Sequence, residues 1–508
     1  MKRYIYNIKW LMTFFVAFVS CESYLEEEPK TFLSPDFYFQ SESQIQAVVN
    51  GVYTFLDDRF NGDIGPGTQT YLLLEYLHGY GDKPASTGNI NLNQAITLTI
   101  AENNVYIEHI WETCYKAIEN CNSIIEGLTG VSTEVIGENK KNTLLGEIYF
   151  LRAYHYFTLV QLFGEVPLKL TSTSDLSASQ TELSSIEDVL VQVENDLLEA
   201  DALMANDSWT SVEGRVTKGT VKSLLSKVYL TMAGYPLQKG TAYYQKAYEQ
   251  AKAVVGSSQF YLFDNYAALR DEANENSGEF IWMIQRQSQY AGSPVHANML
   301  PYPEPEQAIS SNSSVGGALA PAQSFYDSYT AGDLRVEEKA FYYTQHEALD
   351  NPGTIVDLGR PYIYKFWDQA AAESGNSGKN YALLRYADVL LVLAEAKAQA
   401  DGGSTNDAAA VNAYFEVRSR ANPEEGKPTS ITTNDVLKER FWEICFEGHT
   451  WYDMLRTRKA FNVNTGNIVD MLGYKAPSHP EGLVFEEGDL LFPYPLREKR
   501  LNPSLTRN

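Results

Sequence analysis

The stretch GTVKSLLSKVYLTMAGYP, residues 219–236, carries a clear helical pattern in this chain of 508 residues. Apolar side chains recur at positions i, i+3, i+4, i+7 and i+11, which are Val221, Leu224, Leu225, Val228 and Met232. This spacing places them on one face of an α-helix. Gly234 and Pro236 follow at once, and both residue types end helices. The stretch therefore predicts an amphipathic helix that stops before Gly234.

A second helix is predicted directly after the first, in TAYYQKAYEQAKAVVG (241–256). Its common side carries Tyr244, Ala247, Tyr248 and Ala251. Two helices with small and aromatic residues facing each other, about 34 residues together, are similar to a tetratricopeptide (TPR) hairpin.

The same periodicity returns along most of the chain. It predicts further helices in residues 107–127, 144–164, 184–204, 381–403, 406–423 and 434–456. The helix at 184–204 is expected to begin with a capping box from Ser184 to Glu187. Helical hairpins that cannot bury a face alone must stack on their neighbours, so we expect a solenoid-like helical body.

Two segments lack a sustained period, residues 57–104 and 264–380, and both are rich in Gly, Asn, Pro, Ser and Tyr. Long irregular segments in a compact protein are usually functional or disordered. The aromatic content of both segments argues against disorder. We expect ordered loops packed on the helical body, with a strand or two such as EFIWMIQ (279–285).

Composition excludes some classes of partner. The formal net charge is -25, and removal of residues 1–20, which contain three basic and no acidic residues, takes it to -28. Nucleic-acid binding depends on Lys and Arg neutralising phosphates, so this charge disfavours it. The same charge argues against binding to anionic lipid through a polybasic segment.

The N-terminus has the features of an export signal. Lys2, Arg3 and Lys9 precede an apolar run from Trp10 to Val19, which is too short to span a bilayer as a helix. A basic start, a short apolar core and a small residue before the cleavage site are typical of a secretory signal peptide, here residues 1–20. Cys21 then suits the lipidated first residue of a bacterial lipoprotein. The alternatives are a buried N-terminal helix, or an ordinary signal followed by an ordinary cysteine.

Catalytic signatures are missing from the sequence. It has no GxSxG elbow, HExxH helix, P-loop or GxGxxG after a strand. The motif GHTWYD (448–453) brings His449, Trp451 and Asp453 together, and we interpret it as a packed helix end with a satisfied histidine. Cys114 and Cys121, seven residues apart on one helical face, are interpreted as core residues without metal spacing.

Several motifs together resemble the SusD/RagB family, the surface lipoproteins of Bacteroidota nutrient-uptake systems. They occur in the family's order and span nearly the whole mature chain. These motifs are CESYLEEEP (21–29), LLGEIYFLRAYHYFTLVQLFGEVPL (144–168), GRVTKGTVKSLLSKVYL (214–230), RYADVLLVLAEA (385–396), ERFWEICFEGHTWYDMLR (439–456) and LFPYPLREKRLNPSLTRN (491–508).

This resemblance implies a mainly α fold with about four TPR-like helix pairs, and with irregular loops and a few short strands forming the ligand face. It implies one domain over 21–508, with the helices inside 40–56, 105–255 and 381–460. The implied role is non-catalytic capture of an oligosaccharide outside the cell, or of a peptide in some members. The implied partner is a SusC-like TonB-dependent transporter in the outer membrane. We expect no cofactor, metal centre or catalytic residue.

Sugar rings have flat apolar faces edged by hydroxyls, so a binding site needs exposed aromatic rings beside amides, carboxylates or guanidinium groups. In characterised family members the ligand aromatics come from the loops before the first scaffold helix and after the 279–285 strand. Those loops here are 74–94 and 286–305. The predicted ligand contacts are Tyr76, Tyr80, Asp82, Asn91, Arg286, Tyr290 and Tyr302. Trp111, Trp282, Trp442 and Trp451 are instead expected in the core.

Three alternatives to glycan capture stay open at this point. The first is capture of a peptide by the same loops. The second is a TPR-like scaffold with no small ligand, whose contacts would lie in a helical groove. The third is a glycoside hydrolase, because 65 acidic residues supply many carboxylate pairs by chance.

Overall fold

The computed structural model describes residues 38–506 with short internal exceptions. The exceptions are residues 62–69, 84–88, 174–180, 291, 302–307, 312–317 and 375–376, and the side chains of 58–61. The predicted signal peptide, Cys21 and Tyr302 therefore lie outside the described residues.

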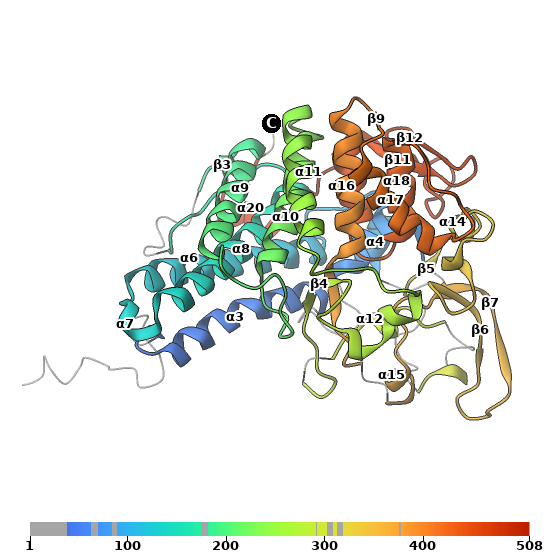
Figure 1. Cartoon of the computed structure of the whole chain (residues 1–508), viewed down its shortest axis with the longest axis horizontal. Helices are drawn as coiled ribbons and strands as arrows, with labels where there is room; N and C mark the ends of the chain where they lie inside the picture. The colour runs from blue at the N-terminus through green and yellow to red at the C-terminus, as the bar shows by residue number, and fades with distance from the viewer. Residues whose placement is uncertain are drawn as a thin grey trace, which may run out of the picture.

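The long helices pack in chain order, each against the next (Figure 1). Among the described residues, eight of them form four consecutive pairs, α3–α6, α8–α9, α10–α11 and α16–α17. This arrangement confirms the predicted mainly α, TPR-like fold. The bounds are α6 (Val105–Gly130), α8 (Glu138–Phe163), α9 (Ile186–Leu203), α10 (Lys218–Ala233), α11 (Thr241–Gly256), α16 (Tyr386–Ala400), α17 (Ala408–Ala421) and α18 (Thr433–Glu443), with α3 (Glu42–Asn61) packed on α6.

The predicted hairpin of residues 219–256 is confirmed as α10 and α11. Thr217 caps α10 by accepting a hydrogen bond from the backbone N–H of Thr220, and Gly234 follows the last helical residue. The five apolar residues that set the period, from Val221 to Met232, are all buried.

Helix α8 packs against α3, α6, α9 and α10 and is buried on most of its circumference. Gly146 allows the close approach of α9, because a Cβ at this position would lie 2.5 Å from Cγ of Met204. A helix that is buried on all sides has faces of similar hydrophobicity. Its place in the fold is therefore set by close packing and not by an apolar stripe.

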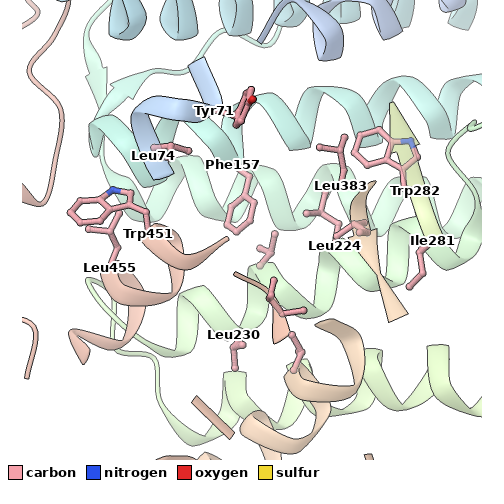
Figure 2. Packing of buried hydrophobic residues seen from close by; sticks show 14 of the residues in the cluster. Tyr71, Leu74, Phe157, Leu224, Leu230, Ile281, Trp282, Leu383, Trp451 and Leu455 are labelled. Carbon is pink, nitrogen blue, oxygen red and sulfur yellow. The ribbon is translucent and has the colours of Figure 1, made fainter. Parts of the chain in front are cut away.

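The main core joins the scaffold to the shorter elements. Figure 2 shows Phe157 of α8 and Leu224 of α10 in one cluster with Trp282 and Trp451. The four tryptophans assigned to the core from sequence are buried, as predicted. Cys114 and Cys121 are buried free thiols, also as predicted.

The described strands form two-stranded antiparallel sheets only. The predicted strand at 279–285 is confirmed as β4 (Phe280–Ile284), which pairs with β8 (Tyr381–Arg385) directly before α16. The other pairs are β1 (Gly81–Asp82) with β5 (Ala320–Pro321), β2 (Val166–Pro167) with β3 (Leu183–Ser184), β6 (Tyr342–Glu347) with β7 (Ile355–Ile363), β9 (Ser404–Thr405) with β10 (Ile431–Thr432), and β11 (Lys459–Asn462) with β12 (Asn467–Asp470).

Two local predictions were wrong. The segment 57–104, expected to form loops, contains α4 (Thr70–Leu77), whose eight residues are all buried, and α5 (Ile90–Ile96). The cap of α9 is Ser185, which accepts from the N–H of Asp188, because Ser184 belongs to β3. The remaining short helices are α7 (Thr133–Ile136), α12 (Val295–Asn298), α14 (Gln323–Tyr326), α15 (Gln369–Ser374), α19 (Thr450–Thr457) and α20 (Leu496–Leu501).

We searched the described helices for membrane spans. None of them combines the length and the apolar character that crossing a bilayer requires.

Candidate ligand-binding face

The two irregular segments meet on one side of the helical array, where α12, α15, β6 and β7 gather in Figure 1. Asn298 of α12 donates a hydrogen bond to the hydroxyl of Tyr71 in α4, at 2.8 Å. Strand β1 of the first segment pairs with β5 of the second. The structure therefore brings together the two loop regions from which ligand contacts are predicted.

This face has a small apolar core of its own. The Tyr364 and Trp367 rings stack with centroids 5.3 Å apart, and the His346 ring lies 4.5 Å from Trp367. Stacked rings of this kind add stability beyond their buried area. We define the small core as Leu300, Ile309, Ala320, Tyr343, Leu358, Tyr362, Tyr364, Trp367 and Ala372. The face is thus packed, and Trp367 is committed to its interior.

Tyr76 and Tyr80 are not exposed, contrary to prediction, since each is only 1% accessible. The Tyr80 hydroxyl donates to the carbonyl oxygen of Phe461 at 2.9 Å and accepts from its N–H at 2.7 Å. Burial raises the pKa of Tyr80 well above its usual value. Both side chains pack in the main core, so the prediction that they contact ligand is wrong.

Asp82 and Asn91 lie at the edge of the face and are half-buried. Asp82 pairs with Arg360 at 2.8 Å, which joins β1 to β7. The side-chain oxygen of Asn91 accepts a 3.3 Å hydrogen bond from the N–H of Val105, which ties α5 to α6. The Asp82 carboxylate remains partly accessible to a ligand. The side-chain oxygen of Asn91 is instead occupied by its hydrogen bond to Val105.

Arg286 is a positioning residue, because its side chain has no exposed surface. Its guanidinium pairs with Asp57 near the end of α3, and its N–H donates to the side-chain oxygen of Asn380 at 2.6 Å. Removing charges from water is costly unless they are paired, and this pair meets that condition. The contact fixes the chain that leaves β4.

Tyr290 projects from the turn that Arg286 fixes. Its N–H donates to the carbonyl oxygen of Gln287 at 3.0 Å, and 82% of the residue's surface is exposed. The neighbouring residues Gln287, Ser288 and Gln289 are exposed too. An exposed ring among amide and hydroxyl groups has the chemistry that a sugar ring requires. Of the predicted contacts, Tyr290 has the most accessible side chain in the described part of the chain.

His296, which lies on α12, is buried beneath this face. Its Nδ1 accepts a hydrogen bond from the N–H of Asp368 at 3.1 Å, and its ring packs on Trp367. Burial lowers the pKa of His296 to about 4, so the ring is neutral at physiological pH. It supports the face from inside.

Comparison with known proteins gives the family. Residues 23–230 match a family model described as "Starch-binding associating with outer membrane", and residues 335–508 match one described as "SusD family". A solved SusD superfamily protein from Parabacteroides distasonis is 33% identical, with 94% of this chain and 99% of that chain covered and a TM-score of 0.83. The chain belongs to the SusD family.

Two further matches show the range of similarity. A SusD-like protein of Formosa agariphila is 27% identical over 540 residues, which cover 98% of each chain. A structure described as a complex with a xylogluco-oligosaccharide is 21% identical, with 91% of this chain and 98% of that chain covered and a TM-score of 0.73. At that identity the likeness shows the shared fold alone.

In this SusD-family chain the GHTWYD motif is structural, as interpreted from sequence. His449 directly precedes α19, and its Nδ1 lies 3.3 Å from Nζ of Lys227, which pairs with Asp388. Burial and the neighbouring ammonium group lower the pKa of His449 to about 4. Asp453 pairs with Arg440 and Arg456. The motif therefore holds α19 against α10, α16 and α18.

A buried ion network around α18 has no counterpart in the sequence predictions. Arg335 bonds to Asp333, Glu439 and Glu443, and Arg385 bonds to Glu279, Glu443 and Glu447. The only sequence signal is the i, i+4, i+8 run of Glu439, Glu443 and Glu447. This network fastens β4 and β8 to the last helices. Among the described residues, no cluster of three or more His, Cys, Asp or Glu side chains is arranged to hold a metal ion.

Proposed function

We propose that this protein binds oligosaccharide at the cell surface and delivers it to a transporter without cleaving it. The observation that carries the proposal is the exposed Tyr290 ring on a turn fixed by the pair of the buried Arg286 with the half-buried Asp57. A fixed aromatic platform binds with little loss of side-chain entropy. Support also comes from the starch-binding description of the matching family model and from the oligosaccharide in a structure of the same fold.

The proposed partner is a SusC-like TonB-dependent transporter in the outer membrane, and the proposed anchor is lipid on Cys21. Glu22 and the run Glu26 to Glu28 follow Cys21, and such an acidic segment resembles the signal that sends lipoproteins to the outer face. Lipid chains on this cysteine would hold the protein at the membrane, since each buried methylene contributes about 0.8 kcal/mol.

Tyr290→Ala is expected to lower affinity for the bound glycan about tenfold, because the ring supplies apolar contact that alanine lacks. The measurement is a glycan array with the wild-type mature chain, followed by calorimetry with the best neutral oligosaccharide on the array. Tyr261→Ala is the matched control, since Tyr261 is 59% exposed but lies outside this face, after α11. Equal affinity of the two variants would remove Tyr290 from the site.

The same array separates the alternative functions. Binding to a peptide library with no glycan bound would replace glycan capture by peptide capture. Release of shorter products from a polysaccharide would indicate a glycoside hydrolase. A TPR-like scaffold would bind its protein partner equally well with and without Tyr290→Ala.

Cys21→Ala is expected to move the protein from the membrane fraction to the soluble fraction, because the variant lacks the thiol that would carry lipid. Metabolic labelling with a radioactive or clickable fatty acid should mark the wild-type chain and leave the variant unmarked. Cys114→Ala is the control, because this thiol is buried and should not affect labelling. Labelling of Cys21→Ala at the wild-type level would contradict the anchor.

A further inference from the structure

A groove of about 460 Å³ runs between the C-terminal half of α3, the loop 213–215 and the end of β4. Its volume falls within the range of about 300–1,000 Å³ that small-molecule sites occupy. The groove adjoins the predicted face, because Asp57 in its wall pairs with Arg286, which leads into the Tyr290 turn. None of the sequence predictions placed a ligand here.

The floor of the groove is apolar and its rim is polar. Leu56, Met283 and Ile284 are buried beneath it, whereas Asn50, Thr54, Glu213 and Gln285 are exposed along it. An apolar floor edged by amide, hydroxyl and carboxylate groups matches the apolar face and the hydroxyl edge of a sugar.

Gln285 is held in place at the rim. Its side-chain amide exchanges two hydrogen bonds with Asn276, at 2.8 and 2.9 Å, and its Nε2 also donates to the carbonyl oxygen of Met283. Gly214 makes room for it, because a Cβ there would lie 2.1 Å from Nε2 of Gln285, and its φ of +68° favours glycine. The rim is thus preorganised, which lowers the entropy lost on binding.

Arg215, the arginine that lines the groove, is already neutralised, and Arg286 lies buried behind Asp57. Arg215 bonds to both oxygens of Glu147 and to the side-chain oxygen of Asn50, and Arg286 pairs with Asp57. Glu213 adds an exposed carboxylate to the rim. A sugar that carried a carboxylate or sulfate would therefore meet negative charge, and the Arg215 guanidinium that could bind it is committed to Glu147.

We propose that this groove is a second subsite, which binds an uncharged sugar unit of the oligosaccharide whose adjoining units contact Tyr290. The inference rests on the proposed function and specifies both the extent of the site and the chemical class of its ligand. The Asn50 amide nitrogen and the Thr54 hydroxyl would bond to sugar hydroxyls, and the exposed carboxylate of Glu213 and the half-buried one of Asp57 would accept hydroxyl protons. The site selects neutral glycans over uronate-rich or sulfated ones.

The test uses the mature chain and two sets of polysaccharides. The neutral set is xyloglucan, mixed-linkage glucan, galactomannan, arabinan and starch; the acidic set is polygalacturonate, alginate and chondroitin sulfate. We expect binding to a neutral polymer, with a dissociation constant that changes less than twofold between 0.05 and 0.5 M NaCl. Binding of an acidic ligand through cationic side chains would instead weaken steeply as the salt concentration rises.

Thr54→Trp then fills the groove from the exposed side of α3. It should weaken binding of the long neutral oligosaccharide at least tenfold and leave its shortest bound fragment within twofold of wild type. Ala47→Trp, an exposed position two turns earlier on α3 and outside the groove, is the control and should bind as wild type does.

The outcomes separate the two proposals. Weaker binding in both Thr54→Trp and Tyr290→Ala supports the groove. Weaker binding in Tyr290→Ala alone, or binding of acidic polymers only, overturns the groove and leaves glycan capture standing. No binding to any polysaccharide overturns glycan capture, and the groove with it.

Discussion

Arg335→Met is expected to lower the free energy of unfolding of the mature chain by about 4 kcal/mol. The side chain of Arg335 is fully buried and bonds to Asp333, Glu439 and Glu443. Methionine fills a similar volume but removes one cation from the network, so Asp333 and Glu439 keep only Arg418 among the buried arginines, and Glu443 keeps Arg385 and Arg420. The excess of buried negative charge that remains is among the largest single-residue costs in a protein.

Urea denaturation followed by tryptophan fluorescence measures this loss. The control is Lys459→Met, which removes an exposed pair with Asp470 and is expected to cost less than about 1 kcal/mol. If the two variants lost the same small amount, the ion network around α18 would be incidental to stability.

Trp282→Ala is the second large effect, with an expected loss of about 4 kcal/mol. Trp282 is 1% exposed in β4, and its ring meets Phe150 and Tyr154 of α8 edge-on, at centroid distances of 5.0 and 5.2 Å. Alanine would leave a cavity between the strand and the central helix (Figure 2).

The loss of packing around Trp282 should also destabilise the candidate site, because β4 leads directly into Arg286 and the Tyr290 turn. We expect limited proteolysis to cut near residue 290 faster in Trp282→Ala than in wild type. Val212→Ala, at a residue that is 82% exposed, should change the free energy of unfolding by less than about 0.5 kcal/mol. A stability of Trp282→Ala within that same limit would contradict the assigned role of the strand.

The helical scaffold could be predicted because its signals are local. The spacing of Val221, Leu224 and Val228, with Gly234 after them, defines α10 within four turns of chain. Helix α4 could not be predicted in this way. All eight of its residues are buried, so it has no polar face to set a period, and its length is close to that of a buried strand.

The candidate site was only partly predictable. Tyr80 and Tyr290 lie in similar Gly- and Ser-rich sequence, yet one is 1% and the other 82% exposed. The difference arises from Phe461, a distant residue whose backbone bonds to the Tyr80 hydroxyl. Contacts between residues far apart in the chain produce no periodic pattern in the sequence. The bond between Arg335 and Glu439 is equally invisible in the sequence.

The separate apolar core beneath the ligand face has an evolutionary consequence. Substitutions at sites that share no partners tend to act additively on stability. The small core around Trp367 is distinct from the main cluster that holds the helices. Substitutions in this small core should therefore add their cost to that of scaffold substitutions without amplifying it. Such a division of the molecule lets the loops of the candidate face diverge among relatives that retain one architecture.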